Sequence, residues 1–442
     1  MMSPATFAAG FAALAVVAHG APLETNPFMI ENPEILLDHQ HPALGMSIPE
    51  NAATFKTDVV LNEEAKTNLT RRLEATSHDI RALESHFRRR MIVNPSQLPV
   101  KATYKPVPWP GSYWPTYQDG INVRWDGNQP SAAEKYARAF NLNPKSFMDA
   151  LSRNNGILAH SSRRPCTNDY QCYDLNDGSA CAKRDGESRG HCIPTWFGLC
   201  HAWAPAAIVE PEPRCPVNKN GVTFQPNDIK ALITQVYDGA RVPTVFLGAR
   251  YNGPDSGEGV LDKYGRFADP AARDLGPGFL HIAITNMIGL LNTTFVADVT
   301  AGAQVWNQPV RGYEIVSTKP MSTQEGAKQF FNTQTYPFNN QAKSLLYVRN
   351  RISYIVESND NVPLVSTGRV EYFTTKREYE YVLELDAAGN IIGGEWVGNS
   401  KQNHFDFMWF LNGRAADNTV LRSGLSYKNV KDLLSASIQG SC

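Results

Sequence analysis

The segment Thr195-Trp196-Phe197-Gly198-Leu199-Cys200-His201-Ala202-Trp203-Ala204 decides how this chain is interpreted, because a cysteine opens a run of helix-forming residues. Unpaired backbone N–H groups and the helix dipole stabilise a thiolate at the start of a helix. Cys200 is therefore the candidate nucleophile, and the segment predicts a helix that begins at the thiol.

The chain has seven cysteines, an odd number that leaves one without an intramolecular partner. Four of them fall in the polar stretch 166–192, which has too few apolar residues for its own core and predicts local cross-links. We expect Cys200 to be free; the alternative is Cys442, although an exposed terminal thiol outside the cell becomes oxidised. The cysteines expected in disulfides, in a pattern that the sequence leaves open, are Cys166, Cys172, Cys181, Cys192, Cys215 and Cys442.

Residues 1–20 have the layout of a secretory signal peptide, with an apolar stretch from Phe7 to Ala18 followed by small residues. The chain contains 42 Lys and Arg against 43 Asp and Glu, so its charge favours neither a nucleic-acid nor a membrane partner. No later segment has the ~18 consecutive apolar residues of a membrane anchor. The sequence therefore predicts a secreted protein, located extracellularly or in the cell wall.

The rest of the chain divides by composition. Residues 21–93 are predicted to be a helical prosegment, because apolar residues recur at helical spacing between Glu63 and Arg90. The three arginines 88–90 predict a processing junction; the alternative is a solvated helix end with favourable cations. After this come an extended and helical region (94–160), a disulfide-rich segment (161–195), a catalytic core (196–320) and a β-rich C-terminal region (321–442).

Several shorter elements can be placed. Residues 131–151 are expected to form two short helices, and the Pro-, Tyr- and Trp-rich stretch 101–118 is expected to be extended and packed on another surface. Strands with alternating apolar and polar residues are predicted at 344–356, 368–375, 377–385 and 390–397. These strands predict a twisted antiparallel sheet.

A cysteine nucleophile needs a base, and the base needs an orienting group. His201 is disfavoured, because consecutive helix positions point in different directions. His281 lies in a strand-like run, 278–286, and Asp298 lies in the next predicted strand, 295–300. Neighbouring strands place paired side chains ~4.5–5.5 Å apart, so the two could form the orienting pair. The alternative for His281 is a satisfied core histidine, whereas Asp298 would be costly in an apolar strand unless paired.

The order Cys, His, Asp on a helix start and two later strands is the papain-like arrangement. The predicted fold class is therefore α+β, with a core related to papain-like cysteine proteases, a disulfide-rich segment and a C-terminal antiparallel sheet. In this core, Cys200 lies at a helix start, and His281 and Asp298 lie on antiparallel strands.

Residues 304–315 read Gln-Val-Trp-Asn-Gln-Pro-Val-Arg-Gly-Tyr-Glu-Ile. The run VWNQPVRGYEI closely resembles the defence-eliciting peptide of the oomycete elicitor transglutaminases, which are extracellular glycoproteins of Phytophthora and its relatives. The blocks WFGLCHAWAPA, FLHIAITN and FVADVTAGAQVW also resemble that family. The end of the motif, YEIVS, departs from the family form, which bears on receptor binding and not on chemistry.

The resemblance implies a calcium-dependent protein-glutamine γ-glutamyltransferase with a papain-like core. Carried over, the catalytic cysteine falls on Cys200, the base on His281 and the orienting carboxylate on Asp298. Asn307 beside Trp306 is the rival to Asp298 as orienting or oxyanion-supporting group. The partners implied are proteins with accessible Gln and Lys, and a plant receptor for the elicitor motif. The elicitor residues are Trp306, Pro309 and Arg311. The motif would be both recognised by the plant and needed for enzyme function if it packed against the active centre with Arg311 exposed.

Two other functions use the same residues differently. A secreted papain-like protease would deacylate the same cysteine with water in place of an amine. A non-enzymatic recognition or adhesion protein would need Cys200 only as a structural residue.

Calcium has no strong local signature in the sequence. The oxygen-rich clusters Asp169, Asp174, Asn176, Asp177 and Glu357, Asn359, Asp360 do not have the spacing of a helix-loop-helix calcium site, and solvated turns explain both. The calcium ligands therefore remain unassigned. Two sequons predict glycosylation, at Asn68 and Asn292.

Overall fold

The fold is seen in a computed structural model that describes residues 35–46, 77–127, 129–254, 256–273 and 275–442. The signal peptide, the sequon at Asn68 and much of the predicted prosegment lie outside these residues. Among the described residues the α-helices are α2 (Ser77–Phe87), α3 (Ala132–Ala139), α4 (Pro144–Asn155), α5 (Cys200–Val209), α6 (Pro226–Gly239), α7 (Pro277–Leu290), α8 (Thr323–Phe331) and α9 (Tyr427–Gln439). None of them is long and apolar enough to span a membrane.

The strands are β1 (Ile35–Leu36), β2 (Lys101–Thr103), β3 (Pro165–Cys166), β4 (Ser179–Ala182), β5 (Gly190–Pro194), β6 (Val217–Lys219), β7 (Val222–Phe224), β8 (Pro243–Gly248), β9 (Val296–Asp298), β10 (Asn307–Met321), β11 (Ser344–Ile355), β12 (Thr374–Leu385), β13 (Ile391–Trp396) and β14 (Phe407–Leu411). Nine strands form one antiparallel sheet in the order β1-β8-β14-β9-β10-β11-β12-β13, with β2 also paired to β10. The α+β class and the C-terminal antiparallel sheet are therefore confirmed.

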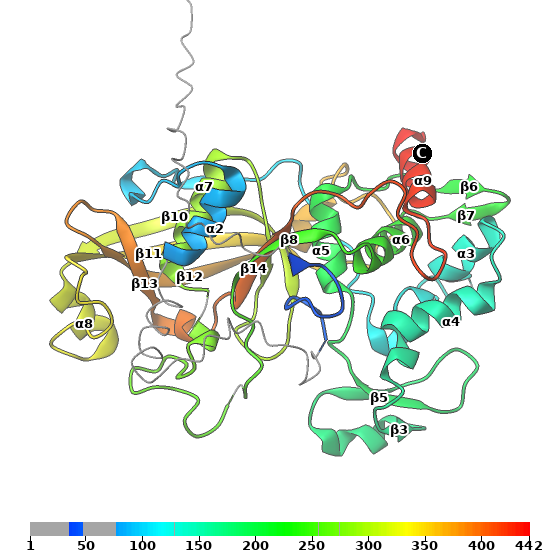
Figure 1. The fold of residues 1–442 in the computed structure, drawn as a ribbon, viewed down its shortest axis with the longest axis horizontal. Coiled ribbons are helices and arrows are strands. Elements are labelled where there is room, and N and C mark those ends of the chain that lie inside the picture. Colours follow the sequence, from blue (N-terminus) through cyan, green and yellow to red (C-terminus); the bar gives the residue numbers. More distant parts are fainter. Residues whose placement is uncertain (1–34, 47–76, 128, 255, 274) are drawn as a thin grey trace, which may run out of the picture.

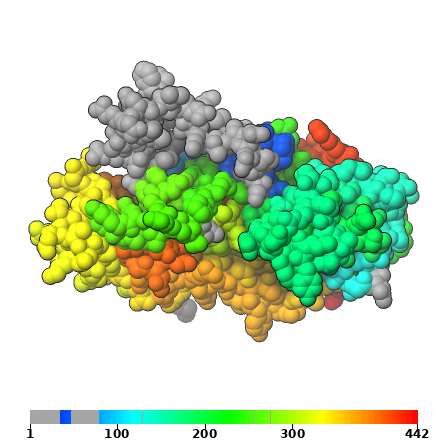
Figure 2. All heavy atoms as spheres, turned by 90° about the horizontal axis from the view of Figure 1, so that it is seen from below, coloured from blue at the N-terminus to red at the C-terminus, as the bar shows by residue number. Residues whose placement is uncertain are grey.

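The long strand β10 runs through the middle of an elongated molecule (Figure 1). Helices α5 and α6 pack together at one end, near α3, α4 and α9, whereas α2 and α7 cover the other part of the sheet (Figure 1). The disulfide-bonded block, with strands β3, β4 and β5, stands on the surface as a blue-green lobe (Figure 2).

The two faces of the sheet belong to different hydrophobic cores. Val296 of β9 and its cross-strand partner Trp409 of β14 pack into the core that contains α5 and α6. The next pair, Ala297 and Met408, packs into the core that contains α7. Because side chains alternate between faces along a strand, Asp298 shares the face of Val296.

Most predicted elements are present, with one exception among the C-terminal strands. Helices α3 and α4 match the two expected short helices, and β11, β12 and β13 match three of the predicted strands. The prediction of a strand at 368–375 is wrong: Arg369–Phe373 form a 3-10 helix, which Gly368 opens with a positive φ of 73°. A left-handed residue there ends extended backbone and starts a turn.

The ion pair between Lys230 and Glu212 is fully enclosed in the protein. Lys230 of α6 donates to Glu212 Oε1 at 2.9 Å and to the Pro110 carbonyl at 2.8 Å, and its Nζ lies 5.4 Å from the centre of the Trp109 ring. Both side chains are nearly inaccessible, at 1% and 5% exposed. Each charge therefore depends on the other for compensation.

We expect Lys230→Met to lower the free energy of unfolding by about 3–5 kcal/mol, because it leaves the Glu212 carboxylate buried without its cation. Lys428→Met is the matched control, since the Lys428–Asp432 pair on α9 is exposed, and it should change stability by less than about 0.5 kcal/mol. Urea unfolding followed by circular dichroism measures both. Equal urea midpoints for the two variants would contradict the conclusion that Lys230 compensates the buried charge of Glu212.

Candidate active site

Cys200 is the first residue of α5, as predicted, and it is the free cysteine of the chain. Disulfides join Cys166 to Cys181, Cys172 to Cys192 and Cys215 to Cys442. The expected local cross-links in the disulfide block and the pairing of the terminal cysteine are therefore confirmed. The residue before the helix, Leu199, gives no side-chain cap, which leaves the helix N-terminus open to the thiol.

The thiol lies against the start of β10. Asn307 Nδ2 lies 3.4 Å from the Cys200 sulfur, and the thiol donates to the Val305 carbonyl over 3.6 Å. Cys200 is only 1% exposed. Burial raises the pKa of the Cys200 thiol to about 12, and hydrogen bonds from Asn307 only partly oppose this rise. The thiol is therefore protonated at neutral pH in this state.

Asp298 lies on the same face as Asn307, because the two residues are direct partners in the antiparallel β9–β10 ladder. Its Oδ1 accepts hydrogen bonds from the backbone N–H of Trp306 at 2.9 Å and from the Thr300 hydroxyl at 2.9 Å. Its Oδ2 is buried and has no hydrogen-bond partner among the described residues. Burial raises the pKa of the Asp298 carboxyl to about 7, against these hydrogen bonds and the charge of Arg250.

The structure therefore brings together Cys200, Asn307 and Asp298. Asn307 connects the other two, since its side-chain amide contacts the thiol and its backbone pairs with Asp298. Its Oδ1 accepts from the indole N–H of Trp409 at 2.8 Å, which fixes the amide orientation toward the sulfur. A carboxyl with a pKa near neutrality beside a thiol is suited to accept and return a proton.

His281 is not part of this cluster, and its predicted strand is wrong. Residues 277–290 form helix α7, which Pro277 opens at a position where its fixed φ and missing N–H favour a helix. The run is fourteen residues long and buried, and alternation cannot distinguish a buried helix from a buried strand. The predicted pairing of His281 with Asp298 is also wrong, because β9 pairs with β10 and β14.

The His281 ring lies in the core on the other face of the sheet from Cys200. Its Nδ1 lies 2.9 Å from the Tyr381 hydroxyl of β12. Burial lowers the pKa of His281 to about 4, so the ring is neutral at physiological pH. These contacts are those of a satisfied core histidine.

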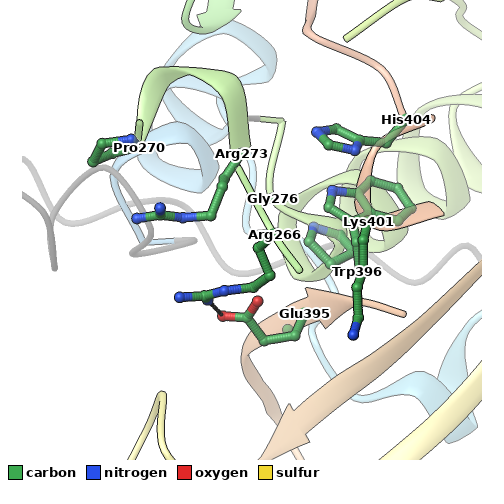
Figure 3. A pocket seen from close by; sticks show the side chains of 10 residues that line it. Arg266, Pro270, Arg273, Gly276, Glu395, Trp396, Lys401 and His404 are labelled. Carbon is green, nitrogen blue, oxygen red and sulfur yellow. Dashed lines mark hydrogen bonds and ion pairs between the residues drawn. The ribbon is translucent and has the colours of Figure 1, made fainter. Parts of the chain in front are cut away.

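The other described histidines after the prosegment also have structural partners. His404 Nδ1 and Nε2 contact the carbonyls of Ser400 and Ala272, and its ring stacks on Trp396 beside a small pocket that Arg266 also lines (Figure 3). His191 contacts the Arg163 carbonyl, and His160 packs on Phe197. His201, next to the thiol, is held through Nε2 by Asp238 of α6 at 3.0 Å.

Arg250 was missed by the sequence analysis. It follows β8, is partly buried, and its charge favours the ionised form of Asp298. A single arginine after an apolar strand carries no distinctive pattern, so only the folded arrangement reveals it. Glu357 was assigned only to a solvated turn, yet its charge acts on the thiol and Gln308 Nε2 donates to it at 2.7 Å.

The elicitor-like motif forms the first part of β10 and the residues before it. Trp306 packs on Tyr113 with 5.4 Å between ring centres, and Pro309 is buried. The motif therefore packs against the thiol, as expected. The expectation of an exposed Arg311 is wrong: its side chain is 13% exposed and binds Glu371 and Thr374.

The carboxylates of the first oxygen-rich cluster have partners within the protein. Asp174 and Asp177 are paired with Arg164 and Arg163, and Asp169 caps the Cys181 N–H. Among the described residues, the group of His, Cys, Asp or Glu ligand atoms close enough to hold a metal is Cys166, Cys172 and Cys192. These sulfurs are in disulfides and are unsuited to calcium, which prefers oxygen ligands.

Asn292 is exposed at the end of α7 and adopts a positive φ of 47°. Its side-chain amide bonds to both backbone groups of Lys105, at 2.9 and 3.2 Å. Its position at the surface is compatible with a glycan, and glycosylation remains a prediction.

Comparison with known proteins supports one family. The sequence model of the family described as transglutaminase elicitor matches residues 79–440. The fold is similar to the crystal structure of the GP42 transglutaminase from Phytophthora sojae, with a TM-score of 0.74 and 51% sequence identity over 82% of this chain and 98% of that chain. Among curated proteins, no sequence matches this chain.

We expect Cys200 in the native full-length chain to react with iodoacetamide at pH 8 on the order of 100-fold more slowly than an ordinary exposed thiol, because little thiolate is present. The rate should rise about tenfold per pH unit up to the pKa. Mass spectrometry of the time course measures the adduct. Cys200→Ser should give no adduct even in urea without reductant, and fast native labelling would contradict the buried thiol.

Proposed function

This chain belongs to the transglutaminase elicitor family, and on that premise we propose that it is a protein-glutamine γ-glutamyltransferase. The observation that carries the proposal is the contact of the free thiol of Cys200 with Asn307, across the ladder from Asp298. These groups supply a nucleophile, a hydrogen-bond donor and an acid–base carboxyl in one place.

The proposed reaction is acyl transfer in two steps. The Cys200 sulfur attacks the side-chain amide carbon of a protein glutamine, the C–N bond breaks, and ammonia leaves with the proton that the thiol gave up. The ε-amine of a protein lysine then attacks the thioester, and the sulfur leaves and recovers a proton. The product is an isopeptide cross-link between glutamine and lysine.

Asp298 is the group that we assign to proton transfer. A carboxyl with a pKa of about 7 is divided between its two protonation states at neutral pH, so it can accept the thiol proton and donate it to the leaving amine. Its Oδ1 is fixed by Trp306 and Thr300, and its Oδ2 is left for this exchange. No histidine is required in this assignment.

The oxyanion needs preorganised donors at the thiol. The backbone N–H of Cys200 lies at the start of α5, and the Asn307 amide nitrogen lies 3.4 Å from the sulfur. Together they can stabilise negative charge on the amide oxygen during attack. Asn307 is therefore assigned to oxyanion support.

The enzyme must favour an amine over water, which separates the proposed reaction from the rival proteolysis. The half-buried Trp306 and Tyr113 rings form an aromatic contact beside the thiol and are placed to exclude water from a thioester. Trp203 is fully buried in the core and is not available for this role.

The wider setting is also part of the proposal. The signal-like residues 1–20 and the three disulfides support secretion, to the extracellular space or the cell wall. The partners are proteins with accessible Gln and Lys, and a plant receptor that binds the motif with Trp306, Pro309 and Arg311. Calcium dependence is expected from the family resemblance, and no step of the proposed mechanism is routed through the ion.

We expect Cys200→Ser to abolish cross-linking and Asp298→Asn to lower kcat by on the order of 100-fold or more, because an amide keeps the Oδ1 contacts but cannot transfer the proton. Incorporation of a labelled primary amine into a glutamine-rich protein such as casein measures the activity. It is assayed with calcium, before and after limited trypsin cleavage at the arginines 88–90.

His281→Gln is the matched control, since it changes a buried imidazole on the other face of the sheet. It should cost stability and leave kcat within a few-fold of the unmodified chain. Backbone cleavage of the casein without amine incorporation would favour the protease. Full incorporation by Cys200→Ser would favour the non-enzymatic function.

A further inference from the structure

Residues 35–46 lie along the active-site face of the protein and end on the thiol. The segment starts as β1 at the edge of the large sheet, paired with β8, and then turns toward the start of α5 (blue in Figure 1). It lies outside the residues 79–440 that the family model matches. It is therefore an addition to the matched unit that covers the site.

Gly45 rests directly on the Cys200 sulfur. A Cβ added at Gly45 would lie 2.7 Å from that sulfur and 2.6 Å from the Gly198 carbonyl oxygen, which is closer than real Cβ atoms approach. The Gly45 carbonyl accepts from the Gly198 N–H at 2.8 Å, and the Gly45 N–H donates to His201 Nδ1 at 3.1 Å. The main chain at Gly45 therefore occupies the space in front of the nucleophile.

The contacts on both sides of Gly45 are also to the main chain of the segment. Asn307 Nδ2, the amide that touches the sulfur, donates to the Ala43 carbonyl at 2.7 Å. Arg250 donates to three carbonyls, those of Pro42 at 2.8 Å, Leu44 at 2.9 Å and Met46 at 2.9 Å. The segment is bent here, since the Leu44 N–H donates to the His41 carbonyl. All of these donors bind backbone carbonyls, which every peptide has, so they can hold a peptide largely without regard to its side chains.

The anchors of the segment lie away from the thiol. Leu37 and His41 are fully buried. The His41 ring lies 4.9 Å from the Trp409 ring, and its Nε2 contacts the Thr244 hydroxyl at 2.9 Å. The segment can therefore be weakened by substitutions that touch no group assigned to the chemistry.

We propose that the groove made by Gly198, Arg250 and Asn307 is the site that binds the glutamine-bearing peptide, and that residues 41–46 occupy it and keep the full-length chain latent. The inference rests on the proposed function, because it takes Cys200 as the nucleophile. A tethered segment acts at a high effective concentration and excludes peptide substrates that share its backbone contacts.

The same chain carries a means of release. Arg88 and Arg90 are exposed in the turn after α2, with Arg88 at a φ of 50°, whereas Met91 is buried and bonded to Glu84. Cleavage in this turn would separate residues 35–46 from the catalytic part of the chain. The segment would then be free to dissociate, since the tether that supplies its effective concentration is cut.

The test compares two leucine substitutions in the full-length chain. Gly45→Leu places a side chain on the sulfur, so the segment must leave the groove; Gln40→Leu is the matched control, because Gln40 is exposed. We expect the rate of Cys200 alkylation at pH 8 to rise at least tenfold in Gly45→Leu and to stay unchanged in Gln40→Leu. Amine incorporation into casein should rise in the same variant.

A second variant guards against a folding defect at Gly45. His41→Ala removes the anchor on Trp409 without touching the thiol, and it should also raise the alkylation rate severalfold. Thermal unfolding identifies the folded variants. Two folded variants with unchanged alkylation would overturn the latency. Faster alkylation without any amine incorporation would leave the latency standing and contradict the transferase instead.

The peptide site is tested by addition of a synthetic peptide of residues 35–46 to the Gly45→Leu variant. The peptide should slow alkylation and raise the KM for the glutamine substrate at unchanged kcat, and the same peptide with leucine at Gly45 should do neither. Slower alkylation without competition against the glutamine substrate would overturn the assignment of the groove to that substrate.

Discussion

The antiparallel pairing of β9 with β10 is the constraint on which the site depends. It sets Asp298 opposite Asn307, and the contact of Asn307 with Cys200 then brings the carboxyl to the helix that carries the thiol. A shift of one residue in this register would turn Asp298 into the other core. Two tryptophans support this register. The indole N–H of Trp409 on β14 donates to the Asn307 side-chain oxygen, and the backbone N–H of Trp306 donates to the Asp298 carboxyl.

The same sheet separates the thiol from the histidine that the sequence predicted as its base. One face carries Cys200, Asp298 and Asn307, and the other face carries α7 with its buried imidazole. In the proposed mechanism, a carboxyl does the proton transfer that an imidazole performs in papain-like enzymes. Burial makes this feasible, because desolvation of the carboxylate raises its pKa to the range where proton transfer in both directions is fast at neutral pH.

The helix start, the free cysteine and the long C-terminal strands could be predicted from the sequence, because a run of helix-forming residues, an odd number of cysteines and apolar–polar alternation can be recognised without the fold. The prediction of a strand at 278–286 was wrong for a physical reason. In a fully buried run the residues are apolar on every side, so the helical and the strand periods cannot be told apart, and a proline at the first turn is a weaker signal than the β-branched residues that follow. Arg250 and Gly45 could not have been found at all, since their roles come from contacts with residues distant in the chain.

The proposed transfer to an amine and the proposed latency make a common demand on this site. A thioester that lasts long enough to meet a lysine must be kept from water, so the nucleophile has to lie in a deep, enclosed place. Such a place also raises the pKa of the thiol, and an occupied groove therefore leaves Cys200 both covered and protonated. Removal of the segment would uncover the thiol and return the donors of Asn307 and Arg250 to the substrate, whose own bulk would then keep water away. Under the proposal, one displacement would thus open the groove and free the nucleophile, so a single barrier would separate the latent chain from the active one.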